Sequence, residues 1–353
     1  MPAWQSWTEQ VLQQIAQGKF LGLLTLMFGI GLAIQADSAQ RAGRRWPGPY
    51  LWRAALLLLD RLLHYLLVVE FDVLMGYAVT GAIVAYVITG SPRAQRIWIG
   101  VAASVHALLV AVFTLGLWSG RAGSLGGVPE PNPYREGSWW DLVLLRLDNA
   151  AIFRFEPVFL LFLGVAMFIL GSRLYRAGLF VDAGAVLRRR LIAVGAVAFV
   201  VDLTLGVSNQ NWLFLVRYGT APIVALGLLA LIAEVAGRGR PGWAGRRCAE
   251  LGRVALSGYV LQNILATSLF YGWGLDLGSV PSIWRLPVTL AGFVLVSTVV
   301  LTAAHLWLRR FSRGPVEWLW VKGYDLLAGG TARPAAPARG LRAGPRERSR
   351  AST

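Results

Sequence analysis

The residue types that could do chemistry are concentrated in one strongly apolar stretch, residues 50–90. Its ionisable side chains are those of Arg53, Asp60, Arg61, His64, Glu70 and Asp72. On a helix that turns roughly 100° per residue, Arg53, Asp60 and His64 fall within about 40° of one another. Ionisable groups are costly inside a bilayer, so they face a bundle interior or a water-filled cavity and pair there. This polar stripe is therefore the candidate active centre.

The composition places the stripe inside a membrane. Hydrophobic residues make up 56% of the 353 residues and charged residues only 15%, whereas about a quarter of the residues of soluble domains are charged. Nine apolar runs approach the ~20 residues that cross a bilayer; they are 20–35, 50–69, 71–90, 97–118, 155–172, 190–208, 212–236, 252–273 and 284–308. We therefore predict an all-α fold, a polytopic integral membrane helical bundle with about nine transmembrane helices.

The net charge of +16 comes from arginines that cluster in alternate loops. They follow the first, third, fifth and seventh apolar runs, at Arg41, Arg44, Arg45, Arg93, Arg96, Arg173, Arg176, Arg188, Arg189, Arg190, Arg238, Arg240, Arg246 and Arg247. Under the positive-inside rule, this pattern predicts an N-terminus outside and a C-terminus in the cytoplasm. It favours anionic lipid headgroups, and not nucleic acid, as the partners of these cytoplasmic arginines.

Three regions are expected along the chain. Residues 1–19 are predicted to form a short interfacial segment, residues 20–327 the transmembrane domain with an external loop at 119–154, and residues 328–353 a disordered basic tail in the cytoplasm. The single cysteine, Cys248, allows neither an intramolecular disulfide nor a cysteine metal site, and no metal is expected.

Small and polar residues in other apolar runs indicate contacts between helices and not a reaction centre. Gly22, Gly29 and Gly31 in the first run allow neighbouring helices to approach closely. Asp202 and Arg217 lie in the sixth and seventh runs, near the outer side, and are expected to form a structural ion pair.

Two blocks of the sequence carry recognisable motifs. In the first, LLHYLLVVEFDVLMGYAVTG is similar to a pattern of Gly-Leu-Leu-His followed by Gly-Asp-Ile-Leu-x-x-Tyr-Ala. In the second, GRVALSGYVLQNIL and FSRGPVEWLW are similar to Gly-Arg-Met-Ala-Leu-Thr-x-Tyr and Phe-x-x-Gly-Pro-Leu-Glu-Trp-Leu-Trp. Both blocks resemble the family called domain of unknown function 418, the YeiB-like bacterial membrane proteins. The resemblance covers most of residues 18–325 and implies a multi-pass protein of the bacterial cytoplasmic membrane.

The match with this family falls on named positions of the chain. They are His64, Asp72, Tyr77, Gly252, Arg253, Tyr259, Gln262, Gly314, Pro315, Glu317, Trp318 and Trp320. The chain departs from the family pattern at Asp60 and Arg61, where the family has apolar residues or glycine, and at Phe71 and Val321. Family members also begin with one more helix carrying an Arg-Gly motif, so a truncated gene start or a degenerate paralogue is expected.

The resemblance also implies a class of reaction. The family is similar in architecture to membrane acyltransferases, which carry an acyl group from a cytoplasmic thioester to an acceptor on the far side. By this analogy His64 is the general base that takes a proton from an acceptor hydroxyl or amine. Asp72 or Asp60 is then expected to orient its imidazole.

The expected donor of the acyl group is acyl-coenzyme A. Arg253, with Tyr259 and Gln262, is the candidate site for its phosphates, because the planar arginine fork binds phosphate in bidentate fashion. Two other classes of function remain open. The ionisable residues of the polar stripe could form a satisfied network that only fixes the helix register, or the stripe could line the path of a transported metabolite or lipid.

Overall fold

The computed structural model describes residues 2–120, 130–239 and 242–327, and all regular structure in these ranges is helical. The predicted all-α class is therefore confirmed for the described chain. The tail expected at 328–353 lies outside the described residues, and so does the part 121–129 of the expected external loop.

Six helical segments of the described chain are long and apolar enough to cross a membrane. They are Ala3–Arg41 (α1, Ala3–Ala16, followed by α2, Lys19–Arg41), α5 (Pro92–Trp118), Ala150–Arg176 (ending in α10, Leu161–Arg176), Asp182–Ser208 (mainly α11, Ala185–Ser208), Gln210–Gly237 (ending in α13, Ala221–Gly237) and α16 (Ser282–Arg310). This set agrees with a multi-pass membrane protein.

Three of the nine predicted spans are not among these six. Helix α4 (Leu74–Val87) has 14 residues and α15 (Ala255–Phe270) has 16, so they reach only about 21 and 24 Å against a hydrocarbon core of about 30 Å. Helix α3 (Tyr50–Leu67) has 18 residues, three of them charged. The count of nine spans is thus not confirmed, and the orientation of the termini stays a prediction.

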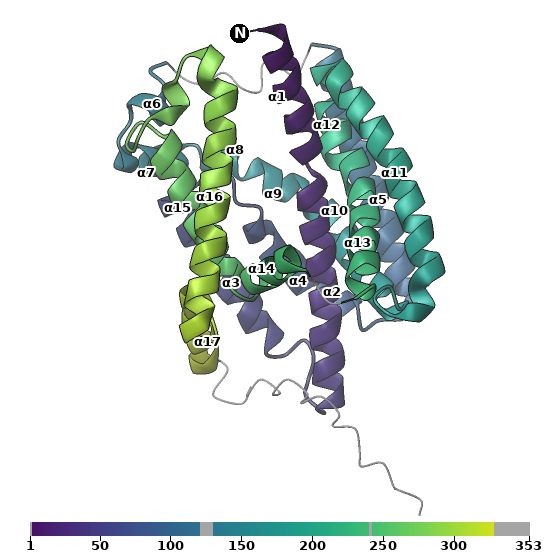
Figure 1. Cartoon of the computed structure of the whole chain (residues 1–353). Coiled ribbons are helices and arrows are strands. Elements are labelled where there is room, and N and C mark those ends of the chain that lie inside the picture. Colours follow the sequence, from purple (N-terminus) through teal and green to yellow (C-terminus); the bar gives the residue numbers. More distant parts are fainter. Residues whose placement is uncertain (1, 121–129, 240–241, 328–353) are drawn as a thin grey trace, which may run out of the picture.

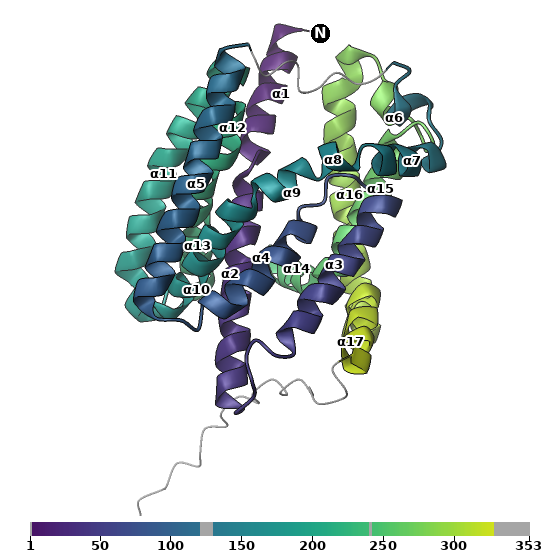
Figure 2. The same ribbon diagram turned by 180° about the vertical axis from the view of Figure 1, so that it is seen from behind.

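Helices α2, α5, α10, α11 and α13 form the larger group of helices. Helix α2 packs against α10 and α13 and lies at the side of this group that faces the second group (Figures 1 and 2). The close approach predicted from glycines is confirmed for two of the three. A Cβ on Gly29 would lie 2.1 Å from the carbonyl oxygen of Phe168 in α10, and one on Gly22 would lie 2.9 Å from the Cβ of Ala225 in α13. Gly31 has nothing within 4 Å of that position.

A second group of helices lies beside the first (Figure 1). It consists of α3, α7 (Trp139–Asp148), α14 (Trp243–Arg253), α15, α16 and α17 (Pro315–Leu327). Helix α16 packs along α14 and α15, while α17 contacts α3 and α15. The short elements are α6 (Pro133–Glu136), α8 (Ala150–Phe153), α9 (Phe155–Phe159), α12 (Leu213–Leu215), a π-helical turn (Val216–Thr220), and 3-10 turns at Asp182–Gly184, Gln210–Trp212 and Leu277–Ser279.

Two arginines from the predicted cytoplasmic loop after the fifth apolar run form ion pairs between helices. Arg176 of α10 binds Asp37 of α2 at 2.9 Å, and Arg188 of α11 binds Glu234 of α13 at 2.6 Å. The C-terminal end of α2 lies at the end of the molecule opposite to the N-terminus (Figure 1). Contact of these arginines with lipid headgroups stays a prediction.

Candidate functional site

Two arginines hold the tight connection between α3 and α4. Arg146 of α7 donates hydrogen bonds to the carbonyls of Leu66 (2.8 Å) and Val68 (3.1 Å), and its Nε lies 3.3 Å from Glu70 Oε2. Arg154 donates to the carbonyl of Glu70. These bonds satisfy carbonyl groups that have no partner within α3. The connection between α3 and α4 therefore forms around paired charges.

Arg61 of α3 is fully buried and lies between two carboxylates. Its Nε donates to Asp60 Oδ2 at 2.9 Å, and its Nη1 lies 3.5 Å from Asp72 Oδ2. The guanidinium also lies over the ring of Tyr259, 5.3 Å from the centroid. Asp72 uses its other oxygen, Oδ1, to accept a bond from the backbone N–H of Leu74 (2.8 Å), which fixes the start of α4.

His64, one helical turn after Arg61, contacts α15. The side chain is 4% exposed. Its Nε2 lies 3.1 Å from Nδ2 of Asn263, and its ring is tilted by 38° against Tyr259 with 5.1 Å between centroids. Because Tyr259 and Asn263 are four residues apart, they share one face of α15. We call Asp60, Arg61, His64, Asp72, Tyr259 and Asn263 the His64 cluster.

The expected contact between a carboxylate and His64 is not found among the described residues. Asp60 and Asp72 both bind Arg61, whose positive charge attracts them. The imidazole is held instead by the neutral amide of Asn263.

Three buried polar atoms of the His64 cluster accept or donate no hydrogen bond among the described residues. They are Arg61 Nη1, His64 Nδ1 and Asp72 Oδ2. Arg61 Nη1 and Asp72 Oδ2 face each other as an ion pair at 3.5 Å. An unpaired buried polar atom costs about 1–3 kcal/mol, so His64 Nδ1 is the atom of the cluster at which a small polar ligand would gain a hydrogen bond. The described chain offers no group of three or more His, Cys, Asp or Glu side chains able to hold a metal ion.

The amide of Asn263 decides which nitrogen of His64 carries the proton. With Nδ2 toward Nε2, as placed here, Nε2 accepts and the proton of the neutral imidazole lies on Nδ1. If the amide turns over, its oxygen accepts from Nε2–H and leaves the lone pair of Nδ1 free. Only the second arrangement makes Nδ1 a base.

Glu317 of α17 fixes the beginning of α15. Its Oε1 accepts bonds from the backbone N–H groups of Leu256 (2.7 Å) and Ser257 (3.1 Å), and its Oε2 accepts from the hydroxyl of Ser257. A Cβ on Gly314 would lie 2.2 Å from Glu317 Oε2, so a side chain would displace the carboxylate. The Gly-Pro-x-Glu motif thus positions the helix that carries Tyr259 and Asn263.

The three residues predicted to bind the donor do not form one group. Tyr259 faces the His64 cluster, whereas Gln262 is exposed on α15. Arg253 is exposed at the end of α14, where its Nη2 lies 3.5 Å from the carbonyl of Ser312. Their role toward a donor stays a prediction.

A second buried polar cluster lies in the larger group of helices. Asp202 of α11 is fully buried and forms an ion pair with Lys19 of α2. It also accepts hydrogen bonds from Gln14 Nε2 (3.0 Å) and from the hydroxyl of Thr220 (2.7 Å). We call these four residues the Lys19 cluster. The sequence did not reveal it, because Lys19 stands at the edge of an apolar run.

The ion pair predicted between Asp202 and Arg217 is therefore wrong. Arg217 lies in the π-helical turn and binds Glu156 of α9 at 2.8 Å. The two residues were assigned to each other because both lie near the outer ends of neighbouring apolar runs. Partners from α2 and α9, distant in the sequence, satisfy each of them separately.

Residues 174–325 match the family model described as "Protein of unknown function (DUF418)". The chain is 29% identical to "Uncharacterized protein YeiB" of Escherichia coli (strain K12), over 94% of this chain and 89% of that protein. It is 24% identical to "Uncharacterized protein YxaH" of Bacillus subtilis (strain 168), over 88% of this chain and 80% of that protein. No solved structure matches the chain significantly. These matches confirm the resemblance predicted from the motifs.

Proposed function

We propose that this YeiB-like protein, whose residues 174–325 match the DUF418 family, transfers an acyl group in the membrane with His64 as general base. The observation that carries the proposal is the buried Nδ1 of His64, which makes no hydrogen bond among the described residues and lies in the same cluster as the ion pair between Arg61 Nη1 and Asp72 Oδ2. A reaction centre needs a group that is free to bind the reactants beside groups that can stabilise charge, and the His64 cluster combines both.

The reaction that suits these groups is attack of an acceptor hydroxyl or amine on a thioester carbonyl. With the Asn263 amide turned over so that its oxygen accepts from Nε2–H, His64 takes the proton of the acceptor at Nδ1 as the new C–O or C–N bond forms. The C–S bond breaks, and the thiolate leaves with the proton that His64 then releases. Arg61 stabilises negative charge that develops on the carbonyl oxygen, since it is the cation of the cluster.

Access to His64 requires movement of α15. The imidazole is 4% exposed, and Tyr259 and Asn263 cover it from α15. The thioester donor, acyl-coenzyme A, would approach from the predicted cytoplasmic side, where Arg253 is exposed and able to bind phosphate.

A structural role is the second candidate, and the paired charges favour it. Arg61 faces two carboxylates, and Glu70 faces Arg146. Buried pairs of this kind can fix the register of helices without any chemistry.

The test uses purified protein in detergent and two readouts. Acyl-coenzyme A that binds the native state raises the melting temperature by mass action, and we expect this rise in wild type and in His64→Gln but not in Arg253→Ala. Transfer of a radiolabelled acyl group to the membrane fraction should fall about 100-fold or more in His64→Gln, the usual contribution of a general base.

His106→Gln is the matched control. His106 is also a buried helical histidine, and its Nε2 contacts the carbonyl of Tyr218 at 3.0 Å, far from α15 in the sequence and outside the His64 cluster. It should keep both binding and transfer. If no acyl-coenzyme A stabilises well-folded wild type, the acyltransferase proposal is abandoned for the structural role.

A further inference from the structure

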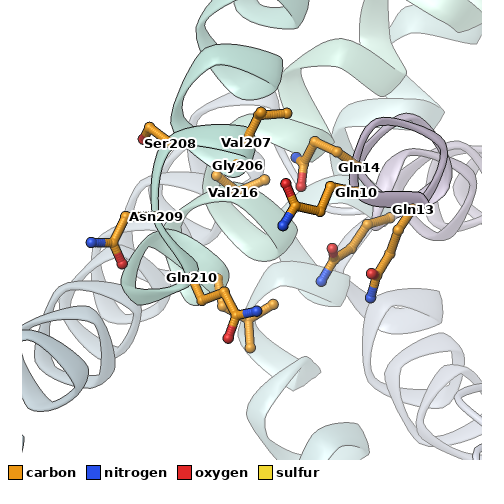
Figure 3. A pocket seen from close by; sticks show the side chains of 11 residues that line it. Gln10, Gln13, Gln14, Gly206, Val207, Ser208, Asn209, Gln210 and Val216 are labelled. Carbon is orange, nitrogen blue, oxygen red and sulfur yellow. The ribbon is translucent and has the colours of Figure 1, made fainter. Parts of the chain in front are cut away.

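A cavity of about 380 Å³ lies between α1 and the turn that joins α11 to α12. Its lining includes Gln10, Gln13, Gln14, Gln17, Asn209 and Gln210. Gln10, Gln13 and Gln14 lie on α1, and Gln17 follows its last residue. Gln13 and Gln14 are three and four residues after Gln10, so the three share one helix face. Figure 3 shows Gln10, Gln13 and Gln14 on the side of α1 that faces the turn. This glutamine pocket falls within the roughly 300–1,000 Å³ of ligand sites.

The chemistry of the lining favours a neutral ligand. None of the described residues that line the glutamine pocket carries a charged side chain. An ionic ligand would therefore find no opposite charge there to offset its loss of water. Amide groups both donate and accept hydrogen bonds, which suits hydroxyl groups because each of these also does both.

The base of the glutamine pocket is built by a buried side chain. Gln14 is 5% exposed and donates from Nε2 to the carboxylate and the carbonyl of Asp202, at 3.0 and 3.3 Å. A Cβ on Gly206 would lie 2.1 Å from Gln14 Cδ, so the absence of a side chain there leaves room for this amide. The Gln14 oxygen is thus fixed as an acceptor at the base.

The backbone beside the pocket is also irregular. Val216 lines the pocket and begins the π-helical turn Val216–Thr220. Thr220, at the end of that turn, bonds to Asp202 and so to the support of Gln14. Single π-helical turns are frequent at functional sites.

We propose that the glutamine pocket binds a neutral, hydroxyl-rich molecule of the sugar class, either free or as the headgroup of a lipid. The elements that line the pocket, α1 and the start of α12, lie toward the end of the molecule that carries the N-terminus (Figure 1). Nothing in this site depends on the acyl transfer proposed for the His64 cluster.

The experiment uses full-length protein purified in lauryldimethylamine oxide, a detergent without a sugar headgroup. Maltose is the free probe and dodecyl maltoside the lipid-like probe, and binding is followed by saturation-transfer NMR for the first and by thermal stabilisation for both. Gln10→Leu/Gln13→Leu should weaken binding by about tenfold or more, since two amide groups lose their hydrogen bonds. Both glutamines are exposed, so the variant should fold normally.

Gln40→Leu is the control, an exposed glutamine near the C-terminal end of α2, and it should bind as wild type does. Binding of maltose supports a site for a free sugar, and binding of dodecyl maltoside alone supports a sugar headgroup. The proposal is overturned if neither probe binds, if the double variant binds as well as wild type, or if glucose 6-phosphate binds more tightly than maltose.

Discussion

The two buried polar clusters solve the same electrostatic problem in different ways. In the Lys19 cluster no buried side-chain polar atom lacks a hydrogen-bond partner, within the residues described. In the His64 cluster three such atoms lack one. Both clusters hold carboxylates and a cation away from water. The difference teaches that buried charge can be fully hydrogen-bonded, as in the Lys19 cluster, or can leave polar atoms without a hydrogen bond, as in the His64 cluster.

The side chains of the two cations explain this difference. Lysine has a compact ammonium with three N–H donors, and Lys19 directs it to Asp202 and to the carbonyl of Gln14. Arginine has five N–H donors in a rigid fork, and the two carboxylates near Arg61 do not satisfy all of them. The first cluster is closed, and the second is able to receive another group.

The largest effect on stability is expected at the Lys19 cluster. Lys19→Met leaves the fully buried Asp202 without its cation, and breaking a buried pair on one side costs about 3–5 kcal/mol. The melting temperature of the detergent-solubilised protein should fall sharply. Lys322→Met, at an exposed lysine of α17, should leave it unchanged. A similar melting temperature for Lys19→Met and wild type would show that the Lys19 cluster is not closed.

A smaller effect is expected at the His64 cluster. His64→Gln removes one hydrogen bond, with Asn263, so it should lower stability by only about 1 kcal/mol. The same melting measurement ranks it below Lys19→Met. If His64→Gln destabilises as strongly as Lys19→Met, the His64 cluster is a structural support and the contrast between the clusters disappears.

The smallest effect is expected outside both clusters, at the start of α7. Asp141 accepts hydrogen bonds from the hydroxyl (2.7 Å) and backbone N–H (2.8 Å) of Ser138, and these bonds lower the pKa of Asp141 below its ordinary 3.8. The stabilisation is therefore present above pH 3.8 and is lost as the pH falls through the lower folded value. Hydrogen exchange of α7 should show better protection in wild type than in Asp141→Asn at neutral pH, and no difference once Asp141 is protonated. A difference that persists in acid would contradict this.

The all-α fold class and the membrane character could be predicted because they depend on composition and on runs of apolar residues. The number of spans could not be predicted in this way, since α4 and α15 are apolar but too short to cross the hydrocarbon core of a bilayer. Helix α4 begins only after Asp72 and Arg154 have shaped the connection before it. Apolar runs show where a helix fits a bilayer, and the polar connections between runs decide how long it is.

The centre of the candidate site could be predicted in part. The spacing of Asp60 and His64 within one apolar run is enough to predict that both belong to the site, because ionisable side chains in such a run must face the interior of the helical bundle. The partners of His64, Tyr259 and Asn263, come from a helix almost 200 residues later, and spacing within one helix carries no information about such contacts. The prediction that Asp202 pairs with Arg217 is wrong for the same reason.

The bonds from Glu317 to the beginning of α15 have a consequence for the order of events during synthesis. Helix α15 leaves the ribosome some 60 residues before the carboxylate that holds it in place. Until α17 has been made and has docked, Tyr259 and Asn263 have no fixed position against His64. The interior around His64 is therefore among the last parts of the protein to be completed, and a chain that stops before Glu317 would insert its helices yet lack this centre.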